Sequence, residues 1–130
     1  MNASGAPSIS GKPAIIEFWA TWCQPCVRAT PHIVELSRKY KDQGLVTAGI
    51  HVQRGIDPEK IESFIDAFSI PYPIGLDRQD TVRTSFGVTP IPHAFVVSHT
   101  GDIVWDGNPL SNPAEFDKWV ERVVNDASGK

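Results

Sequence analysis

The sequence has few cysteines, no concentration of positive charge and no long hydrophobic run. Two cysteines in 130 residues are too few for a framework of structural disulfides, so the cysteine count does not assign a compartment. The formal charge is −3, and no block of Lys and Arg forms a nucleic-acid-binding patch. No apolar run approaches the ~20 residues that a transmembrane helix needs. These absences argue against nucleic-acid-binding and membrane-spanning proteins.

What remains is an ordinary globular composition, with 41% hydrophobic and 21% charged residues. The length suits one domain, which we expect over residues 12–127. Residues 1–11 lack the basic and apolar regions of a secretory leader, so we expect a flexible arm there, or what remains after a leader was removed.

The two cysteines, Cys23 and Cys26, stand where an apolar strand gives way to a helix. A lone C-x-x-C at that place in a βαβ pattern indicates a thiol–disulfide redox centre. With Cys23 at the helix cap, outside the regular turn, its sulfur can reach Cys26. The positive end of the helix then favours the Cys23 thiolate and lowers its pKa. Two inert core thiols or half of a zinc site are the alternatives, but no second C-x-x-C or H-x₃-H pair exists.

Hydrophobic periodicity predicts alternating strands and helices. We expect strands or extended pieces at 14–19, 45–52, 71–74, 94–97 and 102–105, and helices at 24–43, 58–68, 80–85 and 113–124. Asn112 and Glu115 have the spacing of a capping box before the last helix. A right-handed crossover makes the first two strands parallel, and a hairpin at 98–101 adds antiparallel strands. The prediction is an α/β fold with a mixed central sheet and helices on both faces.

At this point the sequence resembles the thioredoxin superfamily, and more narrowly its TlpA/ResA-like thiol–disulfide oxidoreductases. The matching features are F-W-A-T-W-C-Q-P-C at 18–26, a proline at Pro31 and a G-V-x-x-x-P-x-x-F segment at 87–95. Residues 54–76 resemble the helix-bearing insertion of the TlpA-like branch. The resemblance covers residues 12–124 and implies a thioredoxin fold.

The resemblance also implies roles for single residues. Cys23 matches the attacking cysteine, Cys26 its resolving partner, and Glu17 a buried acid beneath the second cysteine. Burial should raise the pKa of Glu17, so that it could accept the Cys26 proton directly or through water. A hydrogen-bonded structural acid is the alternative for Glu17.

Further residues match the substrate surface of the family. Pro92 matches the cis-proline that aligns an incoming backbone, with Ile91 and Trp22 as further substrate contacts. Trp19 is more simply packing beside the site, and Gln24 and Pro25 between the cysteines shape its redox potential. For His93, which follows Pro92, both a local role and contact with a substrate or metal stay open. His32, His51 and His99 are most simply surface or strand-edge residues.

The expected function is reduction of protein disulfides by dithiol exchange, because Gln-Pro lacks the histidine of strongly oxidising relatives. We expect a monomer without cofactor, metal or nucleic acid, with a disulfide-bearing client and an upstream reductant, either a membrane reductase or a thioredoxin system. The family favours an extracytoplasmic location, and a cytoplasmic one stays open. One alternative is a thiol peroxidase, although Thr21 stands only two residues before Cys23, unlike a T-x-x-C pattern. Another is a metal- or cluster-binding module that uses the cysteines of two subunits.

Overall fold

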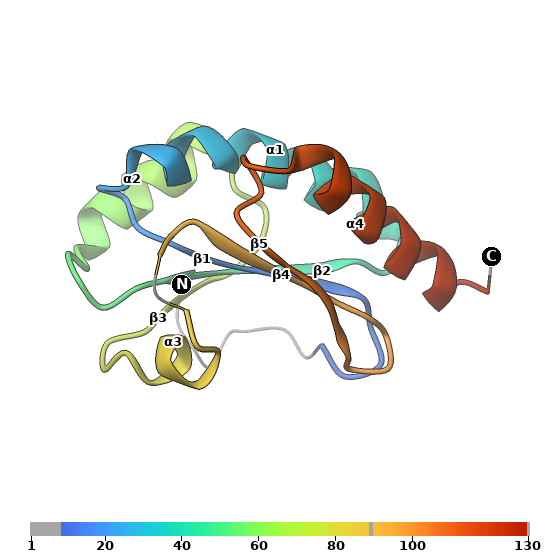
Figure 1. The fold of residues 1–130 in the computed structure, drawn as a ribbon. Coiled ribbons are helices and arrows are strands. Elements are labelled where there is room, and N and C mark those ends of the chain that lie inside the picture. Colours follow the sequence, from blue (N-terminus) through green and yellow to red (C-terminus); the bar gives the residue numbers. More distant parts are fainter. Residues whose placement is uncertain (1–8, 89, 130) are drawn as a thin grey trace.

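The computed structural model describes residues 9–88 and 90–129. One five-stranded sheet runs through it in the order β3-β2-β1-β4-β5 (Figure 1). β1 is parallel to β2 and β2 to β3, whereas β4 is antiparallel to both β1 and β5. The strands are β1 (Ala14–Trp19), β2 (Val46–His51), β3 (Ile74–Leu76), β4 (His93–Val97) and β5 (Ile103–Gly107). The mixed sheet predicted from the sequence is confirmed.

Helices cover both faces of this sheet, as predicted. Figure 1 shows three of them above the sheet and α3 below it. The helices above are α1 (Gln24–Tyr40), α2 (Pro58–Phe68) and α4 (Pro113–Ala127), and α3 is Thr81–Ser85; a short 3-10 turn, η2 (Lys41–Gln43), follows α1. Among the described residues, no helix has the length and apolarity that crossing a membrane requires.

Three expectations differ from the structure or fall outside it. The strand expected at 71–74 begins only at Ile74, where pairing with Gly49 of β2 starts, because Pro71 and Pro73 have no N–H to donate. Asn112 makes no side-chain bond to the backbone of α4; its Nδ2 donates instead to Glu115 Oε2 at 3.4 Å. The arm expected at 1–11 lies mostly outside the described residues.

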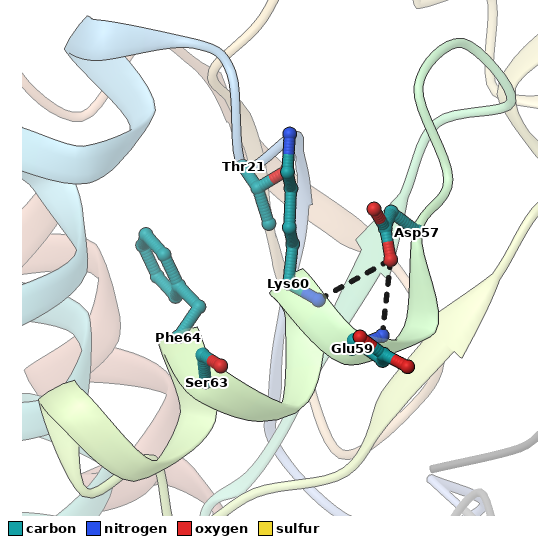
Figure 2. Close-up of a pocket in the computed structure, with 6 residues that line it drawn as sticks. All are labelled: Thr21, Asp57, Glu59, Lys60, Ser63 and Phe64. Carbon is teal, nitrogen blue, oxygen red and sulfur yellow. Dashed lines mark hydrogen bonds between the residues drawn. The ribbon is translucent and has the colours of Figure 1, made fainter.

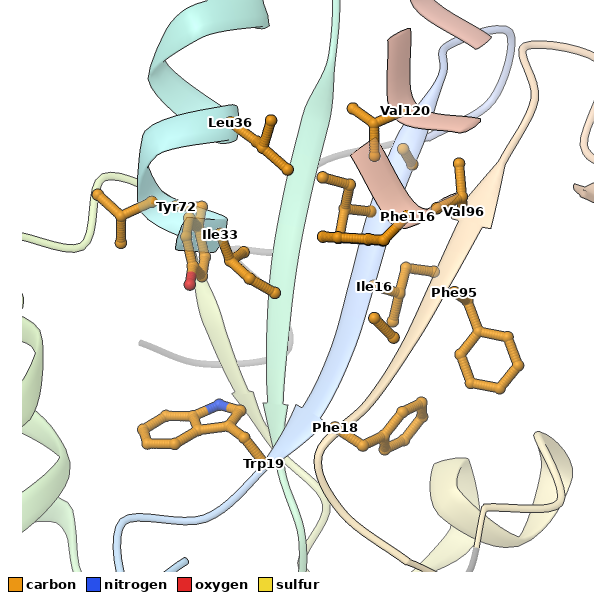
Figure 3. Packing of buried hydrophobic residues seen from close by; sticks show 14 of the residues in the cluster. Ile16, Phe18, Trp19, Ile33, Leu36, Tyr72, Phe95, Val96, Phe116 and Val120 are labelled. Carbon is orange, nitrogen blue, oxygen red and sulfur yellow. The ribbon is translucent and has the colours of Figure 1, made fainter. Parts of the chain in front are cut away.

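Alternation along β1 divides the core into two parts. Trp19 points toward α2, where its ring centroid lies 4.8 Å from that of Phe64. Phe18 points to the opposite side, 5.4 Å from the ring of Phe86, which caps α3. Figure 3 shows Trp19 with Ile33 of α1 on one side of the strands and Phe18 on the other. We call these sides the α1 face and the α3 face.

Candidate functional site

The two cysteines lie at the N-terminus of α1. Cys23 is the N-cap residue, with extended backbone (φ −92°, ψ 108°), and its Sγ accepts the Cys26 N–H at 3.3 Å. The two cysteines form a disulfide, with their Cα atoms 5.2 Å apart. That Cα distance lies within the range that disulfides require. Cys26 is fully buried and Cys23 is 6% exposed, so the cap position places the first cysteine at the surface end of the pair.

The loop before β4 brings a second segment to this disulfide. The Ile91–Pro92 peptide bond is cis, as the resemblance implies. The carbonyl oxygen of Ile91 lies 3.9 Å from Cys23 Sγ, although the two residues are 68 apart in sequence. Pro92 is buried and Ile91 is partly exposed. An exposed edge of this loop is therefore available next to the outer cysteine.

Glu17 lies in the middle of β1, paired with Gly49 of β2 and Ala94 of β4. It shares the α1 face with Trp19 and is 2% exposed. Its Oε2 has no hydrogen-bond partner among the residues that the structure describes, and burial raises the pKa of Glu17 to about 8. The predicted direction of this pKa shift is confirmed. Burial, together with the charge of Glu17, also raises the pKa of the Tyr72 hydroxyl.

Other polar atoms on the α1 face are buried without partners. They are Trp19 Nε1 and Thr47 Oγ1. The Trp19 indole is seated over Gly49, where an added Cβ would lie 3.0 Å from Trp19 Nε1 and 2.7 Å from Ile74 Cδ1. Gly49, the residue of β2 that is paired with Glu17, therefore lets the Trp19 indole approach β2 closely.

The location expected for His51 from the sequence is wrong. It is fully buried rather than at a surface or strand edge. Its Nε2 accepts the Thr21 N–H at 3.1 Å, and its Nδ1 donates to the Val52 carbonyl at 2.7 Å. This pairing requires the neutral ring, and burial lowers the pKa of His51 accordingly. No local sequence signal indicated this burial, because it follows from the parallel register, which places His51 opposite Trp19, just before the loop that leads to Cys23.

Trp22 forms the exposed rim of the site. It is 46% exposed, and its Nε1–H donates to the Arg54 carbonyl at 2.8 Å. Gln24 and Pro25 occupy the first turn of α1 between the cysteines. A groove of about 540 Å³ borders Thr21, the residue before Trp22. It is lined by Thr21, Asp57, Glu59, Lys60, Ser63 and Phe64 (Figure 2).

His93 lies apart from the buried acid. In β4 it pairs with Phe18, so its side chain belongs to the α3 face, opposite to Glu17. Its ring packs on Phe95 with centroids 4.7 Å apart, and its Nε2 lies 2.9 Å from Asp106 Oδ1. These contacts hold the His93 ring against β4 and β5.

Comparisons with known proteins agree with this geometry. ResA, a thiol-disulfide oxidoreductase of Geobacillus kaustophilus, is 37% identical over 93 residues, which are 72% of this chain and 52% of that protein. ResA of Halalkalibacterium halodurans is 31% identical over 97 residues, covering 74% and 53%. The chain thus spans about half the length of these curated relatives.

A solved structure shares the fold. It is a thiol:disulfide interchange protein of the thioredoxin family from Chlorobium tepidum TLS, with a TM-score of 0.78 and 26% identity, covering 89% of this chain and 82% of that one. The predicted thioredoxin fold is therefore confirmed. The AhpC/TSA family matches residues 4–106. With most of its length inside that match, the chain belongs to the AhpC/TSA family.

Proposed function

We propose that this protein is a thiol–disulfide oxidoreductase that reduces protein disulfides through Cys23 and Cys26. The Cys23 thiolate attacks one sulfur of a client disulfide, and the other client sulfur leaves as a thiolate that takes up a proton. Cys26 then loses its proton and attacks Cys23 Sγ, which releases the second client sulfur as a thiolate. The client gains two electrons, and the enzyme is left with the Cys23–Cys26 disulfide.

The observation that carries this proposal is the position of Cys23. It caps α1, where the unpaired N–H groups and the helix dipole stabilise a thiolate, and it is bonded to a buried partner three residues on. The Cys26 N–H already points at Cys23 Sγ and supports negative charge there. The outer cysteine is therefore suited to attack and the inner one to resolution.

Glu17 is the proposed acceptor of the Cys26 proton. Burial raises the pKa of the Glu17 carboxyl to about 8, which makes it a stronger base than an ordinary carboxylate and better suited to accept a proton from a thiol. Glu17 lies on the face of the sheet that α1 covers, and Cys26 is a fully buried residue of α1. The Glu17 carboxyl can take this proton directly or through a water molecule.

Client contact is assigned to the exposed edge around Cys23. The exposed Trp22 directly precedes Cys23, and the Ile91 carbonyl, which lies 3.9 Å from the outer sulfur, is close enough to help align a client backbone. Gln24 and Pro25 complete the first turn of α1 and shape the redox potential. The electron donor would be an upstream thiol reductant, and the family resemblance favours an extracytoplasmic location.

Reduction of insulin by dithiothreitol, with the protein as catalyst, tests the activity. Cys23→Ser should abolish catalysis, and Cys26→Ser should accumulate a mixed disulfide, visible by mass spectrometry. Glu17→Gln should slow resolution of that mixed disulfide and leave the first attack unchanged, whereas equal rates of resolution would remove Glu17 from the mechanism. No catalysis of insulin reduction, combined with peroxide consumption, would favour a thiol peroxidase instead.

The midpoint potential of the Cys23–Cys26 couple tests the direction. A value near about −270 mV, that of thioredoxin, is expected for a reductant. A value near about −120 mV would make the protein an oxidant.

A further inference from the structure

Arg54 is held on the rim of the site by two contacts with Trp22. Its carbonyl accepts the Trp22 Nε1–H at 2.8 Å, and its guanidinium carbon lies 5.0 Å from the centre of the indole. The next residue, Gly55, has a φ of +73°, and a Cβ there would lie 2.6 Å from Trp22 Cδ1. The backbone of Arg54 and Gly55 therefore lies close to the edge of the Trp22 indole, and the Arg54 guanidinium lies over its face. Such cation–π contact restricts the guanidinium without neutralising it.

The charge of Arg54 is not matched by a carboxylate. None of the ion pairs between described residues involves Arg54, and its side chain is exposed. Asp57 is the nearest acid along the chain, but its Oδ1 accepts the Glu59 and Lys60 N–H groups at the start of α2. Lys60 lines the groove with Thr21, and Figure 2 shows its side chain extending alongside Thr21 while Glu59 points away. Arg54 over Trp22 and Lys60 beside Thr21 therefore place two cations next to the segment before Cys23, with the carboxylates of Asp57 and Glu59 also in the groove lining.

We propose that Arg54, held over Trp22, is a specificity residue that favours clients with a carboxylate side chain close to the attacked disulfide. This inference rests on the proposed function, because it assigns a client preference to the same site. A client that lies against the exposed Trp22 ring brings its neighbouring side chains to the guanidinium. Arg suits this role, since its planar fork can bind a carboxylate through two hydrogen bonds while stacked on an aromatic ring.

The test uses three disulfide peptides that are identical except for Asp, Ser or Lys beside one cysteine. Second-order rate constants for their reduction by the reduced protein are measured at low salt. The chain offers a matched control, because Arg122 also lies over a tryptophan, 5.4 Å from the Trp119 ring on α4, and is exposed. Arg54→Ala and Arg122→Ala change the net charge equally, so only a local effect separates them.

We expect the wild-type protein to prefer the Asp peptide over the Lys peptide by about threefold, the size of an exposed ion pair. Arg54→Ala should remove this preference, Arg54→Glu should reverse it, and Arg122→Ala should keep it. At about 1 M salt, where screening acts within about 3 Å, the preference should disappear. An unchanged preference in Arg54→Ala would overturn the inference.

Two further outcomes separate this inference from the activity itself. Alkylation of Cys23 by neutral iodoacetamide should proceed equally fast in Arg54→Ala and wild type. Slower alkylation would mean that Arg54 acts on the thiolate rather than on the client, which overturns the inference. Failure of the wild type to reduce the Ser peptide would overturn the proposed function, and the inference with it.

Discussion

The two faces of the central sheet differ in the side chains that cover them. On the α3 face, the rings of Phe18, Phe86 and Phe95 pack with centroids 4.9 to 5.9 Å apart. On the α1 face, the buried polar atoms Glu17 Oε2, Trp19 Nε1 and Thr47 Oγ1 have no hydrogen-bond partner. An unsatisfied buried polar group costs about 1–3 kcal/mol, whereas a packed aromatic cluster stabilises.

The α3 face therefore contributes mainly to the stability of the fold, and the α1 face carries the groups with chemical roles. Adjacent residues of β1 serve the two purposes, because Glu17 and Phe18 point to opposite faces. Among the described residues, three buried polar atoms without a partner lie on the side that α1 and its cysteines cover, whereas Asp80 Oδ1 lies at the start of α3. Variants on each face should therefore affect different measurements.

The largest expected effect is loss of stability from Phe95→Ala on the α3 face. Phe95 is buried and contacts both Phe18 and Phe86, so removing its ring should lower the free energy of unfolding by about 3–5 kcal/mol. Urea denaturation measures it, with Phe95→Leu as a milder control. The midpoint potential of the folded protein should stay the same, and a changed potential would contradict the division between the faces.

Glu17→Gln should do the opposite and stabilise the protein at alkaline pH. The folded-state pKa of about 8 lies above the ordinary carboxyl value of about 4.3, so the unfolded chain loses its proton first. Stability that is present below about pH 4.3 is then lost as the pH rises through about 8. The Gln variant has no such pH dependence, so its free energy of unfolding should exceed that of the wild type by up to about 5 kcal/mol above pH 8.

The measurement for Glu17→Gln is urea denaturation of the oxidised proteins from pH 4 to 9, so that cysteine titration does not contribute. Near pH 4 the two proteins should be equally stable, because both side chains are then neutral. A constant difference across the range would contradict the raised pKa of Glu17.

Gly49→Ala should disturb the α1 face alone. The new methyl group would overlap Ile74 Cδ1 and crowd the Trp19 indole, so we expect a loss of about 1–3 kcal/mol. The Trp19 fluorescence should shift as well. Gly75→Ala is a matched control on the neighbouring strand, since the Cβ there would meet only the Gly49 carbonyl oxygen, at 4.0 Å. Equal losses of stability in the two variants would contradict the close contact between the Trp19 indole and Gly49.

The smallest effect is expected from His51, through the loop before Cys23. His51→Gln can keep an acceptor for the Thr21 N–H, whereas the shorter side chain of His51→Asn cannot reach it. We expect His51→Asn to lose about 1 kcal/mol more than His51→Gln and to lose protection of the Thr21 amide from hydrogen exchange. Similar protection in both would contradict the assigned bond.

His51 also gives the wild type an acid dependence. Burial lowers its pKa, so the unfolded chain binds a proton first as the pH falls below the ordinary value of about 6.5. Its contribution to stability is then lost toward acid. The stability of His51→Gln relative to wild type should therefore improve between pH 7 and pH 5, as urea denaturation at the two pH values would measure.

Local sequence signals predicted much of this molecule. The C-x-x-C after an apolar strand placed Cys23 at the cap of α1, and the resemblance to thioredoxins implied the buried carboxyl of Glu17. The helix expected at 58–68 is α2, whose N-cap Asp57 and first residue Pro58 are typical of a helix start. These features depend on residues that are neighbours in the chain.

Features that depend on distant partners were missed. The burial of His51 follows from its parallel pairing with Trp19, and the Arg54–Trp22 contact joins residues 32 apart. Likewise, β3 begins where it meets β2, at Ile74, rather than where its own apolar residues begin. No local pattern carries the register between strands, so these positions appear only in three dimensions.

The pairing of Glu17 with Gly49 has a consequence for calorimetry. A glycine offers no ammonium or guanidinium to the acid opposite it, so hydrogen ion binding is what neutralises the carboxyl in the native state. Heating the oxidised protein through its melting transition at pH 7 should therefore release close to one hydrogen ion from this residue. The apparent melting enthalpy should then differ between phosphate and Tris, whose ionisation heats are unequal.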